Sequence, residues 1–516
     1  MSLLAKGRVG EVSGYSGRKR PHAPAGLPWG RGIVTAGGIL ALALLPGSAR
    51  ALQQTAPASY RVEMHGSAPP RITVRATLPS EGAVLTMASS HPADVPEVAD
   101  AGWPGLIRNL AVTDPDGRAV GVTATGSGGW TLARAIRGPL RVQYDIDYAP
   151  LARRGWPAPR EAAYADSTHL IVIGRSLFIT TPAQQTSEVR FSVPRGWQPA
   201  LPWAARAGAQ NAAAVASPAD LTENLLAFLK GPPEVVTAAG FEVRVVALGH
   251  WQPARGELRQ VLAAALPRAV TMVGFEGQGE YLVVLLPQAE DGGESFRASF
   301  ALNSTEAPSP ANRGRWGNTL THEIFHYWNG WRLRGADYPS SQWFQEGVTE
   351  YAANLALVSS GVIGPDAFYA KLASHVANYR RLGTPLDAPG TRKGPPLYSG
   401  GALVAFIWDA TIREQNRGER GLGEVLRALL RETGQGARPY EWSDVQAALE
   451  GAAPNDWAQF HRRFIHGTKP LPLAATFSRL GLVLVEEGDG SLRVREDPAA
   501  SDAARALRRA VIGGDR

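Results

Sequence analysis

Three residues, His322, Glu323 and His326, form an H-E-x-x-H pattern that constrains the fold more than any other stretch of this 516-residue chain. On an α-helix the two histidines lie one turn apart and project from the same face, so both imidazoles can reach one ion. A carboxylate beside the first histidine can take a proton from a water at that ion. The pattern predicts a helix that supplies two zinc ligands and a general base, the alternative being two metal-free structural histidines.

A third ligand is expected from Glu346, because a catalytic zinc ion takes three protein ligands and leaves a fourth position for water. Nineteen residues separate Glu346 from His326, and the sequence between them suits two antiparallel helices joined by a loop. Gly330 is expected to end the first helix. Ser340 or Ser341 is expected to cap the second helix.

One turn after Glu346, Glu350 is placed to hold a ligating histidine through its other ring nitrogen. These residues predict one Zn2+ per chain, with His322, His326 and Glu346 as ligands and Glu323 as the base. Glu350 is expected to orient a ligating histidine by a hydrogen bond.

Four stretches resemble the glycyl aminopeptidase family, which belongs to the gluzincin clan of thermolysin-like zinc peptidases. They are HEIFHYWNGWRLR, WFQEGVTEY, LYSGGALVAFIWDATIR and, more weakly, DWAQFHRRFIHGTKPLPL, and they lie between about residues 240 and 475. The resemblance implies a thermolysin-like catalytic domain, zinc, and a peptide substrate. It also implies that Tyr398 donates to the oxyanion that forms during hydrolysis, although this residue could be an ordinary packing tyrosine. His375 is the reserve candidate for that role.

The formal net charge of +7 does not indicate a nucleic-acid partner, because the surplus lies at the N-terminus. Residues 1–51 hold seven Lys and Arg against the single acid Glu11. There are no cysteines, so disulfides and thiolate metal sites are excluded, and histidines and carboxylates remain as ligands.

Residues 1–51 are typical of a secretory signal peptide. Basic residues precede the apolar run GIVTAGGILALALL, and Ala49-Arg50-Ala51 provides a cleavage site after Ala51. The expected location is the periplasm or the extracellular space, with no stable membrane insertion after cleavage. An uncleaved N-terminal anchor is the alternative. The sequence does not indicate an oligomeric state.

The rest of the chain predicts an α+β protein. Short alternating runs at residues 52–235 predict an antiparallel, β-sandwich-like domain. Residues 236–475 are expected to form a thermolysin-like peptidase domain with a mostly helical C-terminal lobe, and residues 476–516 a short tail.

The alternation at Ser295–Asn303 predicts one strand. The resemblance to thermolysin-like enzymes implies that residues 296–303 line the cleft and pair with the substrate backbone. Aminopeptidases of the clan carry on this strand a glutamate that binds the substrate's free amine, but the aligned stretch Ala298–Leu302 has no acid, and Glu294 does not fit the register. Three functions therefore remain: an aminopeptidase, which the resemblance favours, an endopeptidase on the same scaffold, or a peptide-binding protein with a vestigial zinc site.

Overall fold

The computed structural model describes residues 57–66, 71–88, 96–99, 101–126, 128–153, 164–205, 211–287, 292–388, 394–434 and 438–514. The predicted signal peptide, residues 1–51, lies outside these ranges. The described residues belong to one compact unit that spans residues 55–516. Among them, no helix has both the length and the apolar character that crossing a membrane requires.

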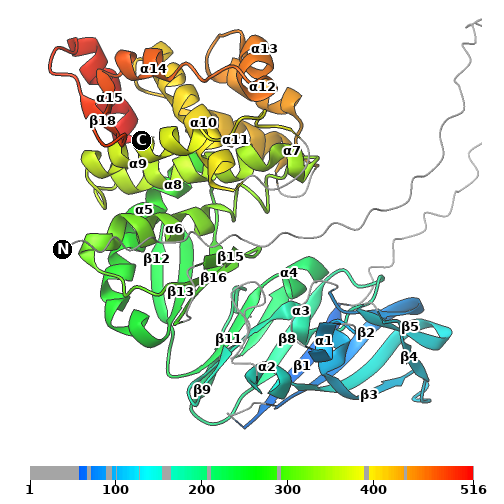
Figure 1. Ribbon diagram of the computed structural model, residues 1–516. Coiled ribbons are helices and arrows are strands. Elements are labelled where there is room, and N and C mark those ends of the chain that lie inside the picture. The colour runs from blue at the N-terminus through cyan, green and yellow to red at the C-terminus, as the bar shows by residue number, and fades with distance from the viewer. Residues whose placement is uncertain are drawn as a thin grey trace, which may run out of the picture. The chain divides into compact units, whose positions relative to one another are not determined.

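Two sheets make up the N-terminal half (Figure 1). All strand pairs in them are antiparallel except β1 with β8, which run parallel. Apolar and polar side chains alternate along β1 and β2, whereas β7 and β11 are almost continuously apolar and buried, and the apolar residues of both sheets form one core. The larger sheet has the order β10 (Ala212–Val215), β8 (Ser187–Ser192), β1 (Ala58–His65), β2 (Arg71–Thr86), β5 (Gly129–Asp147) and β3 (Ile107–Thr113), with β4 (Val122–Ala124) also paired to β5. The smaller sheet has the order β6 (Tyr164–Ala165), β7 (His169–Ile173), β11 (Leu225–Lys230) and β9 (Trp197–Ala200).

A third, mixed sheet carries the site. Its order is β12 (Glu234–Ala238), β13 (Phe241–Ala247), β14 (Gly279–Leu286), β16 (Ser299–Asn303) and β15 (Gly292–Ser295). Strand β14 is buried on both faces: Tyr281 and Val283 pack toward the helical core, whereas Leu282 and Val284 join the core of the N-terminal sheets. This double burial explains the continuous apolar run of a central parallel strand. The α+β class expected from the sequence is confirmed.

The single strand predicted at Ser295–Asn303 is wrong. The chain reverses after Ser295, where Phe296 N donates to Ser299 O across 2.8 Å, so β15 and β16 form an antiparallel hairpin. Strand β16 is buried between β14 and β15, and β15 is the edge strand. The turn was not predictable because it contains neither Gly nor Pro. It is held by the side chain of Asn224, whose Oδ1 accepts from Ala298 N at 2.7 Å.

Helices follow the third sheet and make the C-terminal half mostly helical (Figure 1). Helix α5 (Arg255–Val273) packs on the sheet. The site is built on α6 (Arg313–Phe325) and on the consecutive segments α7 (Tyr338–Gln342), η5 (Trp343–Val348) and α8 (Thr349–Ser359). After α8 the chain forms α9 (Pro365–Tyr379), α10 (Pro395–Gln415), α11 (Leu422–Thr433), α12 (Trp442–Ala452), α13 (Trp457–Phe460), η6 (His461–Ile465), α14 (Leu473–Arg479) and α15 (Asp502–Gly513), with the hairpin β17 (Leu482–Glu486) and β18 (Leu492–Glu496) before α15.

Candidate metal centre

Helix α6 ends earlier than the sequence predicts. Its last residue is Phe325, and the following turn tightens, with Tyr327 N donating to Ile324 O at 3.0 Å. Gly330 does adopt a positive φ of 145°, but it lies in the loop beyond the helix. The cap of the next helix is also not a serine: Asp337 accepts from Ser340 N at 3.2 Å. Asp337 precedes Pro339, which occupies the first turn of α7 and cannot donate there.

Glu346 lies in a π-helical segment, η5, between α7 and α8. Such a segment carries an extra residue per turn and is frequent at functional sites. It is also where α10 comes closest. A Cβ on Gly347 would lie 2.4 Å from the Cα of Gly401, so only glycine permits this contact. The close approach brings the first turn of α10, with Tyr398, to the site.

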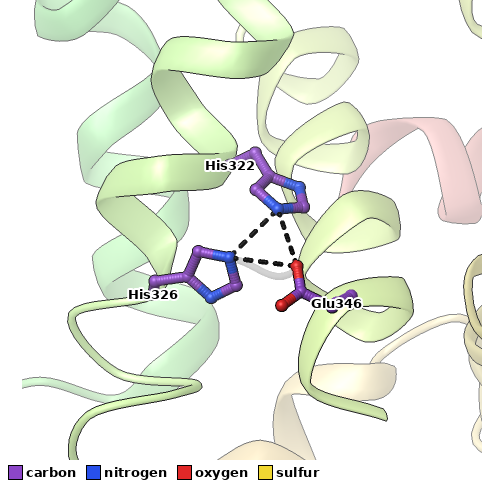
Figure 2. Close-up of side chains that lie close together, drawn as sticks. All are labelled: His322, His326 and Glu346. Atoms are coloured by element: carbon purple, nitrogen blue, oxygen red, sulfur yellow. Dashed lines mark hydrogen bonds and ion pairs between the residues drawn. The ribbon is translucent and has the colours of Figure 1, made fainter. Parts of the chain in front are cut away.

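His322, His326 and Glu346 converge, as Figure 2 shows. The two Nε2 atoms are 3.1 Å apart, and Glu346 Oε2 lies 3.5 Å from His322 Nε2 and 3.4 Å from His326 Nε2. Zinc bonded tetrahedrally at about 2.0–2.1 Å would separate its ligand atoms by about 3.3 Å. The three ligand atoms are therefore spaced to hold a zinc ion, and all three side chains are buried.

The outer ring nitrogens of both histidines are held by hydrogen bonds. Nδ1 of His322 lies 3.0 Å from Glu350 Oε2, and Nδ1 of His326 lies 2.9 Å from the carbonyl oxygen of Asn329. Because these acceptors favour a proton on Nδ1, each Nε2 presents its lone pair to the centre of the triangle. Glu350 thus lies against a histidine of the site.

The carboxylate of Glu350 is buried and has several polar neighbours besides His322. Its Oε1 accepts from Lys371 Nζ at 2.7 Å, and it also faces Asn318 and Asn354. Burial alone would raise the pKa of Glu350, but the contacts with His322 and Lys371 outweigh burial and hold that pKa well below its usual value. Glu350 therefore stays a carboxylate.

The metal-free cluster favours protonated imidazole. Burial alone would lower the pKa of His322, but the hydrogen bonds to Glu346 and Glu350 and the charge of Glu323 raise it to about 10. Burial opposes ionisation of Glu346, yet the two histidines lower the pKa of its carboxyl. The negative charge of the carboxylates thus attracts a cation to this position, and a metal ion can replace the proton.

Glu323 lies beside the triangle on α6, facing the edge strand β15. A Cβ on Gly293 would lie 3.5 Å from Glu323 Oε1. The backbone carbonyl of Glu323 accepts from Tyr281 Oη at 3.2 Å and from Ser295 Oγ at 3.4 Å. Burial is the main cause that raises the pKa of the Glu323 carboxyl above its ordinary value, which suits a group that must both take and release a proton.

Two tyrosines surround Glu346. Tyr398 stacks at 11° to the ring of His322 with 6.3 Å between centroids, and burial, with the charge of Glu346, raises the pKa of its phenol well above 10.0. Tyr338 donates its hydroxyl to Glu346 Oε1 at 3.3 Å. Tyr398 is therefore a neutral donor at neutral pH.

His375 does not fit the reserve role for which the sequence suggested it. Its ring is buried, with Nδ1 3.0 Å from Ser399 Oγ and Nε2 3.7 Å from Glu350 Oε1. Burial lowers its pKa to about 4, so at neutral pH it is an uncharged imidazole. It packs behind Glu350 and does not supply an imidazolium.

Tyr338, Asn329, Tyr281 and Ser295 touch the site and were not found from the sequence. Asn329 belongs to the H-E-x-x-H-x-W-N stretch, which could have suggested it. Tyr338 begins the short helix α7, whereas Tyr281 and Ser295 lie in strands whose pairing the sequence does not reveal.

The edge strand β15 also decides which side chains face Glu323. Gly293 and Ser295 approach Glu323, so by strand alternation Glu294 lies on the other face of the sheet. The face of β15 toward Glu323 therefore carries a glycine and a serine.

The residues of this centre lie in a segment that is similar to a known protein family. Residues 315–385 match the profile of the M61 glycyl aminopeptidase family. No curated protein matches the chain. Among solved structures, an aminopeptidase N family protein from Idiomarina loihiensis superposes with a TM-score of 0.68 at 18% identity, covering 86% of this chain and 82% of that one.

An M1 zinc metallopeptidase from Deinococcus radiodurans has a TM-score of 0.50 at 17% identity, covering 81% of this chain and 94% of that one. A two-domain M1 zinc metallopeptidase variant bound to L-tryptophan has a TM-score of 0.51 at 16% identity, with coverages of 81% and 95%. At these identities the likeness shows a shared fold, and the family match covers the segment that contains all three residues of the triangle.

Proposed function

We propose that this protein is a zinc-dependent peptidase, most simply an aminopeptidase. The observation that carries the proposal is the buried triangle of His322, His326 and Glu346, whose ligand atoms lie 3.1–3.5 Å apart with a carboxylate, Glu323, beside them. The match of residues 315–385 to the glycyl aminopeptidase family supports the choice of peptides as substrates.

The three ligands would hold Zn2+, which when bound polarises a scissile carbonyl and makes an attacking water more acidic. Glu323 takes the proton of that water and delivers it to the leaving amine. Its raised pKa matches this double task, because a carboxyl that is too acidic returns a proton poorly. Glu350 and Asn329 keep the two imidazoles in the tautomer that leaves Nε2 free.

Tyr398 is assigned to the oxyanion. Attack on the carbonyl develops negative charge on oxygen, and a neutral phenol can donate a hydrogen bond to it. The raised pKa of Tyr398 keeps that proton in place. Tyr338, the second hydroxyl on Glu346, supports the third ligand.

An endopeptidase is the second candidate, and the edge strand favours it. The residues of β15 that approach Glu323 are Gly293 and Ser295, so this face offers no carboxylate for a free amine. An aminopeptidase would have to bind the amine through another group, whereas an endopeptidase needs none. Strand addition along β15 would position either kind of substrate.

The deciding experiment is a digest of mixed synthetic peptides by the zinc-loaded protein, read by mass spectrometry, with Glu323→Gln as control. Ladders shortened from the N-terminus establish the aminopeptidase, and internal cuts establish the endopeptidase. Absence of cleavage by a zinc-loaded protein would contradict both and leave a peptide-binding protein.

Export and domain organisation belong to the same proposal. The basic, apolar and small-residue order of residues 1–51 supports a cleaved signal peptide and a periplasmic or extracellular location. We further propose functional domains at 52–235 and 236–475, the first supporting the sheet of the second, with a short tail at 476–516.

A further inference from the structure

The largest sheet carries a groove on its solvent face, on β1, β2, β3, β5 and β8. Its volume is about 610 Å³. Four exposed arginines line the groove, namely Arg61, Arg75, Arg141 and Arg190. One carboxylate, Glu188, also lines it. The groove contains none of the residues assigned to hydrolysis.

Three of the arginines stand in one row across neighbouring strands. Arg61 on β1 is directly opposite Arg75 on β2 and Arg190 on β8. Adjacent strands lie about 4.8 Å apart, so the row places three like charges at short, regular intervals. Like charges directly opposite one another destabilise a sheet unless something compensates them.

The described residues compensate only part of this charge. Arg75 pairs with Glu63, Nη1 to Oε2 at 2.5 Å, and donates to Gln143 Oε1 at 3.2 Å. For Arg61, Arg141 and Arg190, no ion pair or side-chain hydrogen bond to another residue of the described ranges is present. Three guanidinium groups therefore face the groove with free donors, and guanidinium forks bind carboxylates bidentately.

The other lining groups narrow the choice of ligand. Ser59, Thr77, Thr113 and Gln143 add hydroxyl and amide groups, which suit a ligand rich in hydroxyls. The one aromatic residue of the lining, Tyr60, is 2% exposed, so the groove offers no open ring on which a nucleic-acid base could stack. A peptide would pair with a sheet at its edge, whereas this groove lies on a face.

We propose that the groove binds an acidic polysaccharide, a chain of hydroxylated sugars with carboxylates at regular intervals. Arg190 and Arg61, which are neighbours in the row, receive successive carboxylates, and Arg141 with the neighbouring hydroxyls holds the sugar ring beside them. Such a site would attach the protein to an anionic glycan without involving the metal centre.

The test is fluorescence anisotropy with the full-length protein and labelled hexagalacturonate as the uronate probe. Labelled maltohexaose, which has no carboxylate, is the neutral control. The double variant Arg61→Gln/Arg190→Gln should weaken hexagalacturonate binding by about tenfold or more, because two charge-assisted contacts are lost. Maltohexaose should not bind.

The matched control is Arg137→Gln/Arg195→Gln, which removes two exposed arginines of the same domain outside the groove and leaves the net charge equal to that of the first variant. It should bind the probe as the wild type does, and neither variant should melt below the wild-type temperature, since removing opposed like charges does not destabilise a sheet. Three results would overturn the proposal: no binding of hexagalacturonate, equal weakening in both variants, or binding of hexaglutamate or an oligothymidylate as tight as that of the uronate.

Discussion

The phenolic hydroxyl of Tyr281 donates a hydrogen bond to the backbone carbonyl of Glu323, with 3.2 Å between the oxygens. This carbonyl lies in the last turn of α6, where the chain tightens and no longer offers it the usual amide partner: Tyr327 N bonds to Ile324 O instead. Tyr281 comes from the central strand β14 and Ser295, the second donor, from the edge strand β15. The backbone of the proposed base is thereby tied to the sheet that would position the substrate.

Removing the hydrogen bond from Tyr281 to Glu323 should lower kcat more than it lowers the melting temperature. We expect Tyr281→Phe to lower kcat by about tenfold, because small misplacements of a base are costly, with KM little changed. The matched control is Tyr144→Phe, which removes another buried tyrosine hydroxyl, bonded to Leu177 O at 2.9 Å far along the chain in the N-terminal sheets. Steady-state kinetics and thermal melting of both variants decide the matter. Equal kcat in the two variants would mean that Tyr281 is only structural.

Metal content should separate the third ligand from the residue behind it. Glu346→Ala removes an oxygen of the triangle, and we expect the purified variant to contain little zinc. Glu350→Gln keeps a hydrogen-bond acceptor but loses the charge that holds His322, so we expect zinc affinity to fall by about 10- to 100-fold. Zinc titration with a competing chelator measures both. Full zinc occupancy in Glu346→Ala would refute the ligand assignment.

The proposed base has its own variant. Glu323→Gln should bind zinc as the wild type does and lose turnover by about 10²- to 10⁴-fold, the usual contribution of general acid–base catalysis. Metal analysis and peptide hydrolysis of the same preparation give the two quantities. Retained hydrolysis at wild-type rate would rule out Glu323 as the base.

Tyr398 should act on the transition state and not on substrate binding. We expect Tyr398→Phe to reduce kcat by about 10²-fold with little change in KM, since the lost donor interacts with charge that develops only during the reaction. Tyr338→Phe is the comparison, because it also removes a hydroxyl beside Glu346. If Tyr398→Phe changes only the melting temperature, Tyr398 is a packing residue.

His375 should make folding stability depend on pH. Its pKa is lowered by burial to about 4, so between that value and about 6.5 the unfolded chain binds a proton that the folded protein does not. Stability from this group is therefore present above about pH 6.5 and is lost as the pH falls, by about 2 kcal/mol at about pH 5.

Urea unfolding of the wild type and of His375→Gln at about pH 7 and pH 5 tests this linkage. The wild type should lose more stability than the variant on acidification. Identical losses would show that His375 does not remain neutral when folded.

Much of the site follows from local sequence, because its parts repeat at helical intervals. The spacing of His322 and His326 places two imidazoles on one helical face whatever surrounds them, and Glu350 follows Glu346 by one turn for the same reason. The end of α6 at Phe325 and the cap of α7 at Asp337 were not predicted. Gly330 is an equally good helix-ending residue, and Ser340 and Ser341 are equally good caps, a few residues further along the chain.

Pairing between distant segments was decided only by the tertiary structure. Ser295–Asn303 alternates as one strand would, yet a turn held by Asn224, more than seventy residues earlier, folds it into a hairpin and makes β15 the edge. The same long-range packing buries His375 and so leaves it neutral, and it aligns Arg61, Arg75 and Arg190 in one row. The sequence by itself determined which residue types could form the proposed metal centre, through short spacings along two helical segments. The strand that borders this centre and the charges that lie side by side are set by strand register and burial. Local residue spacing does not specify either of these.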